Sequence, residues 1–148
     1  MAKKIRLMTI GFTQKSAKEF FTKLKDANVA RVLDVRLNNR SQLAGFAKQE
    51  DLRFFLGAIH GMEYTHLPEL APTQDILTAY KKEKGDWSVY EAQFMKLIRK
   101  RKIEETTPKP LLDGGCLLCS EDQPHQCHRR LVAEYLAEKW GNVEIQHL

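Results

Sequence analysis

The feature of this sequence that most constrains its fold is a repeated alternation of short apolar runs with longer amphipathic segments. Five apolar runs have the length and residue content of strands, at 5–10, 31–35, 62–66, 116–120 and 143–147. The segments between several of them carry apolar residues at helical spacing. Because strand, helix and strand in succession form a crossover unit, the pattern predicts a mainly parallel sheet of about five strands. We therefore expect an α/β three-layer sandwich of Rossmann-like type, with helices on both faces of the sheet.

Capping patterns mark where two of the helices should begin. Ser16 with Glu19, and Ser88 with Glu91, match the capping box, in which a serine caps the helix and a glutamate follows three residues later. These pairs predict helix starts at Ser16 and Ser88. The remaining segments are expected to form helices near 52–59, 76–80 and 128–139 and a turn at 106–110.

The length of 148 residues fits one domain, 1–148. A chain of this size buries roughly 70% of its unfolded surface, so it can fold without a metal or a disulfide. The cysteines number three, no apolar run of the sequence reaches about 18 residues, and the start is not signal-like. These observations exclude a membrane-spanning protein and argue against a secreted disulfide scaffold, so we expect a cytoplasmic location.

Basic residues are concentrated in the first third of the chain. The net charge is +5, and residues 1–48 hold eleven Lys or Arg against three acidic residues. This asymmetry is compatible with an anionic small molecule or a nucleic acid as partner, and a solvated basic face is the alternative explanation. No membrane partner is expected, and the sequence leaves the oligomeric state open.

Two polar segments follow predicted strands directly, and ligands of parallel sheets bind beyond the carboxyl ends of the strands. The first segment contributes the candidate substrate-binding residues Asp34, Arg36, Arg40 and Ser41. Asp34 and Arg36 are two positions apart on a strand and point to the same side, so the carboxylate can orient the guanidinium toward a ligand. A structural ion pair at the strand end is the alternative.

The second segment holds reactive side chains, namely Cys119, Glu121, Cys127, His128 and Arg129. Cys127, His128 and Arg129 fall at the start of the last predicted helix, where unpaired N–H groups favour an anion or a thiolate. Cys119, at the carboxyl end of its strand, is the competing nucleophile, unless it is a buried inert thiol. A catalytic or redox role is expected for at least one of Cys119 and Cys127.

Cys116 and Cys119 form a C-x-x-C pattern, which is weak evidence for a metal here. Positions three apart on a strand point to opposite faces, and no second ligand pair follows at zinc-knuckle spacing. The sequence contains no G-x-G-x-x-G, P-loop or G-x-S-x-G motif. We therefore expect neither a metal nor a cofactor.

Several segments resemble the DUF488 family of small bacterial and archaeal proteins. They are LDVRLNNRSQLAGFAKQEDL at 33–52, YTHLPEL at 64–70, LLCSE at 117–121 and CHRRLVAEYL at 127–136. The resemblance extends from TIGFT at 9–13 to the closing VEIQHL. It implies a compact α/β domain with signature residues at Asp34, Arg36, Ser41, Cys119, Glu121, Cys127, His128 and Arg129.

Three functional hypotheses remain open. In the first, the protein is an enzyme that acts on a nucleic acid, a nucleotide or another anionic substrate. Arg36 and Arg129 bind the anion, Cys119 or Cys127 is the nucleophile, and Glu121 or His128 transfers the proton. In the second, the same basic groups make a non-catalytic binding module for nucleic acid or a phosphorylated ligand. In the third, the charges of the two segments form a buried network that fixes the loops.

Overall fold

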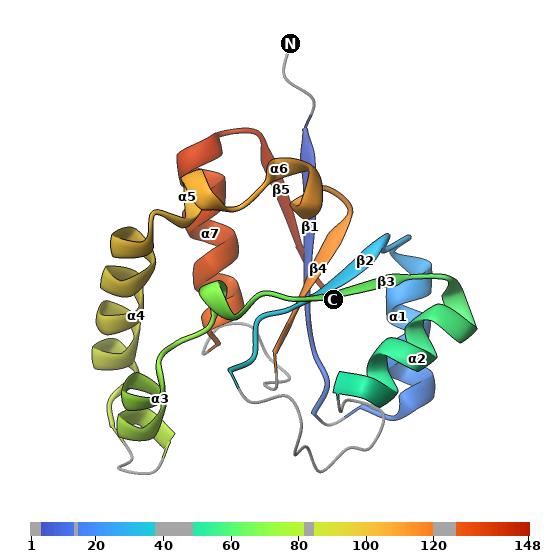
Figure 1. Cartoon of the computed structure of the whole chain (residues 1–148), viewed down its shortest axis with the longest axis horizontal. Coiled ribbons are helices and arrows are strands. Elements are labelled where there is room, and N and C mark those ends of the chain that lie inside the picture. The colour runs from blue at the N-terminus through green and yellow to red at the C-terminus, as the bar shows by residue number, and fades with distance from the viewer. Residues whose placement is uncertain (1–3, 14, 38–48, 82–84, 120–126) are drawn as a thin grey trace.

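A five-stranded parallel sheet lies at the centre of the fold (Figure 1). The computed structural model describes residues 4–13, 15–37, 49–81, 85–119 and 127–148. The strands are β1 (Ile5–Gly11), β2 (Arg31–Asp34), β3 (Glu63–His66), β4 (Gly115–Cys119) and β5 (Val143–His147). Their order is β3-β2-β4-β1-β5, and each pairing is parallel. The predicted α/β class and parallel sheet are confirmed.

The helices connect the strands and cover the sheet on both faces (Figure 1). They are α1 (Ala17–Asp26), α2 (Gln49–His60), α3 (Gln74–Lys81), α4 (Trp87–Arg101), α5 (Ile103–Thr106), α6 (Lys109–Leu112), α7 (His128–Trp140) and the 3₁₀ turn η2 (Pro68–Leu70). None of the helices in the described ranges has the length and apolar character that a membrane span requires.

Two apolar cores, one on each face of the sheet, hold the layers together. On one face, Phe20 and Leu24 of α1 and Leu56 of α2 pack against strand residues that include Ile10 and Leu118. On the other face, α7 packs against a second set of strand residues, and α4 and α5 pack against α7. The core residues on this face include Leu7, Leu33, Leu117, Phe94, Ile98, Ile103, Val132 and Leu136. The alternation of side chains along each strand separates the two cores, and the expected three layers are present.

The capping pattern predicts the start of α1 correctly and that of α4 wrongly. The hydroxyl of Ser16 accepts the N–H of Glu19 at 3.1 Å, which confirms the first cap. In α4 the N-cap is Asp86, whose carboxylate accepts the N–H of Ser88 at 3.2 Å. The carboxylate two residues before Ser88 takes the capping position because aspartate is itself a strong N-cap, and Ser88 lies inside the first turn.

Of the turn predicted at 106–110, Thr107 and Pro108 form the non-helical connection, whereas the residues on either side belong to two four-residue helices, α5 and α6. Lys102 adopts a left-handed conformation with φ of 53° and separates α4 from α5. Pro110 lies in the first turn of α6, where its missing N–H would have no helical partner. Prolines that mark a turn in the sequence therefore also permit these short helices.

The helices that follow β2 and β4 in the chain lie on opposite faces of the sheet. β2 leads to α2, which packs in the core on the α1 face, whereas β4 leads to α7 in the core on the other face. β2 and β4 are neighbours in the sheet. Divergence of adjacent connections creates a topological switch point, the usual place for ligand sites in open parallel sheets.

Candidate functional site

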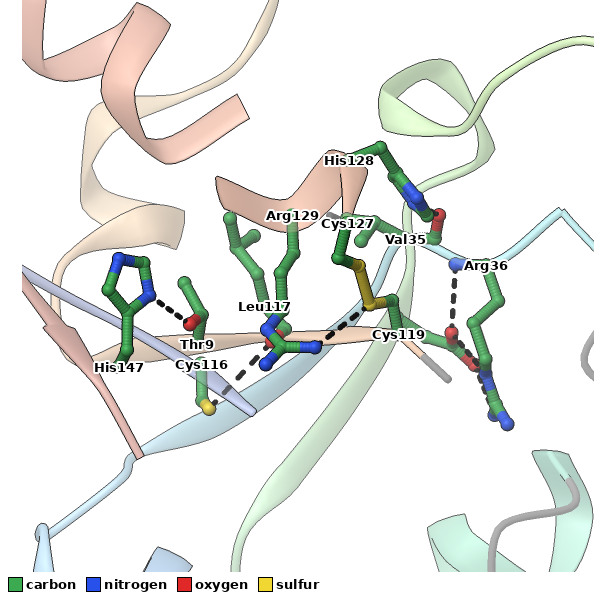
Figure 2. The surroundings of a disulfide bond; sticks show 11 residues. Thr9, Val35, Arg36, Cys116, Leu117, Cys119, Cys127, His128, Arg129 and His147 are labelled. Atoms are coloured by element: carbon green, nitrogen blue, oxygen red, sulfur yellow. Dashed lines mark hydrogen bonds and ion pairs between the residues drawn. A yellow bond between two sulfur atoms is a disulfide. The ribbon is translucent and has the colours of Figure 1, made fainter. Parts of the chain in front are cut away.

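Cys119 and Cys127 meet at the carboxyl edge of the sheet, beside this switch point. Cys119 is the last residue of β4, and Cys127 is the N-cap of α7. Their sulfur atoms form a disulfide with an S–S distance of 2.09 Å (Figure 2). Both side chains are buried. The two residues considered separately as nucleophiles in the sequence are thus one dithiol/disulfide pair.

Arg129 extends from the first turn of α7 toward the sheet and is completely buried (Figure 2). Its Nη1 donates to the Sγ of Cys119 at 3.1 Å. A guanidinium stays protonated at every relevant pH. When the disulfide is reduced, this fixed positive charge favours the thiolate form of Cys119 over the thiol.

His128 connects the start of α7 to the end of β2. Its Nε2 lies 2.6 Å from the carbonyl oxygen of Val35. A carbonyl oxygen only accepts hydrogen bonds, so Nε2 carries a proton. The ring also packs edge-on against Phe94, with centroids 5.5 Å apart. These contacts fix the orientation of the imidazole beside the cysteine pair.

Asp34 and Arg36 form a buried ion pair at the end of β2. The carboxylate of Asp34 accepts Nε and Nη2 of Arg36, both at 2.8 Å, and also the backbone N–H of Arg36 and the hydroxyl of Tyr64. Burial by itself raises the pKa of Asp34. The hydrogen bonds from Arg36, the positive charge of Arg36 and the hydrogen bond from the Tyr64 hydroxyl all lower it, and together they hold that pKa below its usual value.

The guanidinium of Arg36 points away from the disulfide (Figure 2). It lies over the ring of Phe12, 5.4 Å from the centroid. Its Nη1 is buried and has no hydrogen-bond partner among the described residues. The contact predicted between Asp34 and Arg36 is present, and the NH₂ group of Nη1 remains for another acceptor.

The structure therefore arranges the nominated residues in two adjoining groups. Cys119, Cys127, His128 and Arg129 form one cluster, and the ring of His128 reaches the backbone between Asp34 and Arg36. Arg40, Ser41 and Glu121 lie outside the described residues. Arg36 and Cys119 are 83 positions apart in the sequence. The two groups of candidate residues are nevertheless neighbours in space, because β2 and β4 pair in the sheet.

Cys116 lies on the opposite face of β4 and belongs to the other apolar core. Burial raises the pKa of its thiol. The prediction that Cys116 and Cys119 point to opposite faces is confirmed. Cys116 is therefore an internal reference for an unreactive thiol.

Sequence reasoning missed two polar contacts near this edge. Tyr64 of β3 binds Asp34, and Thr9 Oγ1 lies 2.6 Å from Nδ1 of His147 on β5. Tyr64 lies on the strand that pairs with β2, in register with Val32, and its hydroxyl reaches the carboxylate of Asp34 two positions further along. Its polar hydroxyl on an otherwise buried ring is a signal that a partner exists, but strand order is needed to identify it.

Together, the fold and the site define a small α/β protein with a parallel sheet and a buried cysteine pair at its carboxyl edge. The chain belongs to the family described as Domain of unknown function DUF488, whose family model matches residues 16–136. The family resemblance expected from the sequence is confirmed. No curated protein and no solved structure matches the chain.

Proposed function

We propose that the protein is a cysteine-dependent enzyme that acts on an anionic substrate, with Cys119 as its nucleophile. The observation that carries this proposal is the hydrogen bond from the buried guanidinium of Arg129 to the sulfur of Cys119. A fixed cation in contact with a thiol, away from water, favours the nucleophilic thiolate. Burial strengthens this electrostatic effect because the local dielectric constant is low.

The disulfide is the oxidised form of the site. A thiol reductant supplies two electrons and two protons to convert it to two thiols, and Cys119 then loses its proton. The thiolate attacks the electrophilic atom of the substrate: a bond from sulfur forms, and the leaving group departs with its bonding pair. Water then cleaves the sulfur–substrate bond and restores Cys119. His128 and Glu121 are the candidates for moving the proton.

Three features support a negatively charged substrate, such as a nucleotide or the phosphate of a nucleic acid. The N-terminus of the 13-residue helix α7 lies at the cysteine pair, where its N–H groups and dipole favour an anion. The buried Nη1 of Arg36, an NH₂ group, has no hydrogen-bond partner among the described residues. The chain also has a net charge of +5, with its basic excess in residues 1–48.

Thiol reactivity as a function of pH tests the nucleophile. The native protein is reduced in the presence of a metal chelator, freed of both reagents and briefly treated with iodoacetamide, and mass spectrometry resolves Cys116, Cys119 and Cys127. We expect alkylation of Cys119 below about pH 7, with no alkylation of Cys116. In Arg129→Met the pH profile for Cys119 should move upward by about one unit or more. Arg130→Met is the matched control, since Arg130 pairs with Glu134 instead.

If all three thiols resist alkylation until the protein unfolds, the enzyme proposal is wrong. A binding module with structural cysteines would then be the better explanation. It would give steeply salt-dependent affinity for a nucleotide or nucleic acid that is unchanged in the Cys119→Ala variant. If Cys119 is reactive, a screen of nucleotide and phosphoester substrates with Cys119→Ala as the inactive control identifies the reaction.

A further inference from the structure

We propose that the reduced cysteine pair binds Zn²⁺ together with His128. The Sγ atoms of Cys119 and Cys127 and a ring nitrogen of His128 lie within 4.8 Å of one another. Two thiolates and one imidazole are ligands that zinc prefers. This goes beyond the enzyme proposed above, because a Cys119 sulfur bound to zinc is not available as a nucleophile.

The backbone spacing of the two cysteines suits a metal between their sulfur atoms. Their Cα atoms lie 7.5 Å apart, whereas most disulfides span roughly 4.4–6.8 Å. Reduction allows the sulfur atoms to separate. With Zn–S bonds of about 2.3 Å in a tetrahedral site, they would lie about 3.8 Å apart. Both cysteines stand at ends of rigid elements, β4 and α7, which hold this spacing.

The contacts of His128 prepare the ring to act as a ligand. Nε2 carries the proton that is donated to the Val35 carbonyl, so in the neutral ring the lone pair is on Nδ1. Zinc-binding histidines commonly donate their second ring nitrogen to a backbone carbonyl in this way, which fixes the tautomer and ring orientation. We therefore assign Nδ1 as the third ligand atom.

Arg129 is compatible with a metal at this position. Zn²⁺ displaces one proton from each thiol, so two thiolates and a neutral imidazole give a site with no net charge. The guanidinium then donates to a metal-bound thiolate at Cys119, as it donates to that sulfur now. Three protein ligands leave a fourth position for water or an anion. Disulfide and metal complex are thus alternative states of the same residues.

Cobalt(II) reports this coordination directly. The reduced, reductant-free protein is titrated with Co²⁺ under nitrogen, followed by Zn²⁺ as competitor. We expect a sulfur-to-cobalt charge-transfer band, visible bands of tetrahedral cobalt, one metal per chain and loss of both signals with zinc. The Cys119→Ser and His128→Asn variants should bind zinc at least about 100-fold more weakly, since even loss of an outer partner costs about 10–100-fold. Cys116→Ser should bind as the wild type does.

The oxidised wild-type protein is a control that requires no mutation. It has the same sequence, and its disulfide removes both sulfur ligands, so it should show no charge-transfer band. The proposal is overturned if reduced protein gives no such band, or if oxidation or the Cys119→Ser change leaves binding unaltered. This readout does not depend on enzyme activity, so the two proposals can fail separately. Metal binding by a protein whose Cys119 is not alkylated would refute the proposed enzyme but not the zinc site. Alkylation of Cys119 without metal binding would refute the zinc site but not the enzyme.

Discussion

At the scale of single residues, the Asp34–Arg36 pair determines how the end of β2 is held. Both side chains are almost wholly buried, and the carboxylate accepts from the side chain and backbone of Arg36 and from Tyr64. Desolvation of two charges is expensive, so such a pair contributes chiefly through geometry. Removal of one partner is different, because it leaves the other charge uncompensated.

Asp34→Asn should therefore destabilise the protein by about 3–5 kcal/mol at neutral pH. Tyr64→Phe removes one hydrogen bond to the same carboxylate and should cost about 1 kcal/mol. The folded pKa of Asp34 is lowered, so its contribution is present above the unfolded value near 3.9 and is lost as pH falls through the folded pKa. Urea unfolding at several pH values measures both effects.

The pH dependence is the decisive part of this experiment. The difference in unfolding free energy between wild type and Asp34→Asn should be largest above about pH 4 and should shrink under stronger acid. A difference that stayed constant through this range would mean that the carboxylate charge is unimportant. A combined Asp34→Asn/Arg36→Met variant should be more stable than Asp34→Asn alone, since it also removes the buried cation.

The sequence was enough to identify candidate site residues, but not to predict most of the contacts between them. Two-residue spacing on a strand was enough to predict that Asp34 contacts Arg36. The cysteine pair was not predictable in the same way. Cys119 and Cys127 are eight positions apart, and their sulfur atoms meet only because α7 packs against β4 with Cys127 at its N-cap. That placement depends on the apolar core beneath α7, which involves strands distant in the sequence.

At the scale of elements, the N-terminus of α4 tests how capping residues compete. Asp86→Ala removes the acceptor for the Ser88 N–H and should destabilise the protein by about 1 kcal/mol. Ser88→Ala should cost much less, because the backbone N–H of residue 88 remains and its cap is intact. Both positions are exposed, so packing changes little. Thermal and urea unfolding of the two variants make the comparison.

If both variants lost the same amount of stability, or if Ser88→Ala lost more, Ser88 would be the N-cap residue of α4 after all. The sequence contained the signal for Asp86, because aspartate is itself a favoured N-cap and Asp86 directly precedes Trp87, the first residue of α4. The serine–glutamate box is a coincidence of composition in this segment. Elements of four residues such as α5 and α6 have too few turns to show a helical period, so periodicity could not identify them.

At the scale of the whole molecule, crossover connections predicted parallel strands, but the order β3-β2-β4-β1-β5 was not predictable from local sequence. β1 lies between β4 and β5, both more than 100 residues later in the chain. These pairings follow from which helices cover which face, and they create the switch point where the cysteine pair lies. The general location of the site was predictable, because carboxyl ends of parallel strands share one edge.

The two cores predict how the molecule responds to reduction. Each face of the sheet has its own apolar core formed by many buried side chains, so the fold does not depend on the Cys119–Cys127 bond. The bond closes a short loop, with a sequence separation of 8. Loop-closure entropy for this length corresponds to about 2.5 kcal/mol. Reduction should therefore lower the free energy of unfolding by about this amount and leave the native far-ultraviolet circular dichroism unchanged.

Urea unfolding with and without a thiol reductant checks the prediction. Cys119→Ser is the matched control. This variant cannot form the disulfide, so its unfolding midpoint should not respond to the reductant. Loss of secondary structure on reduction would mean that the disulfide holds the two layers together. Such a result would also remove the reduced state on which the nucleophile and the zinc site both depend. A folded reduced protein with a lower midpoint would instead make the dithiol a stable state of the molecule, available for either chemistry.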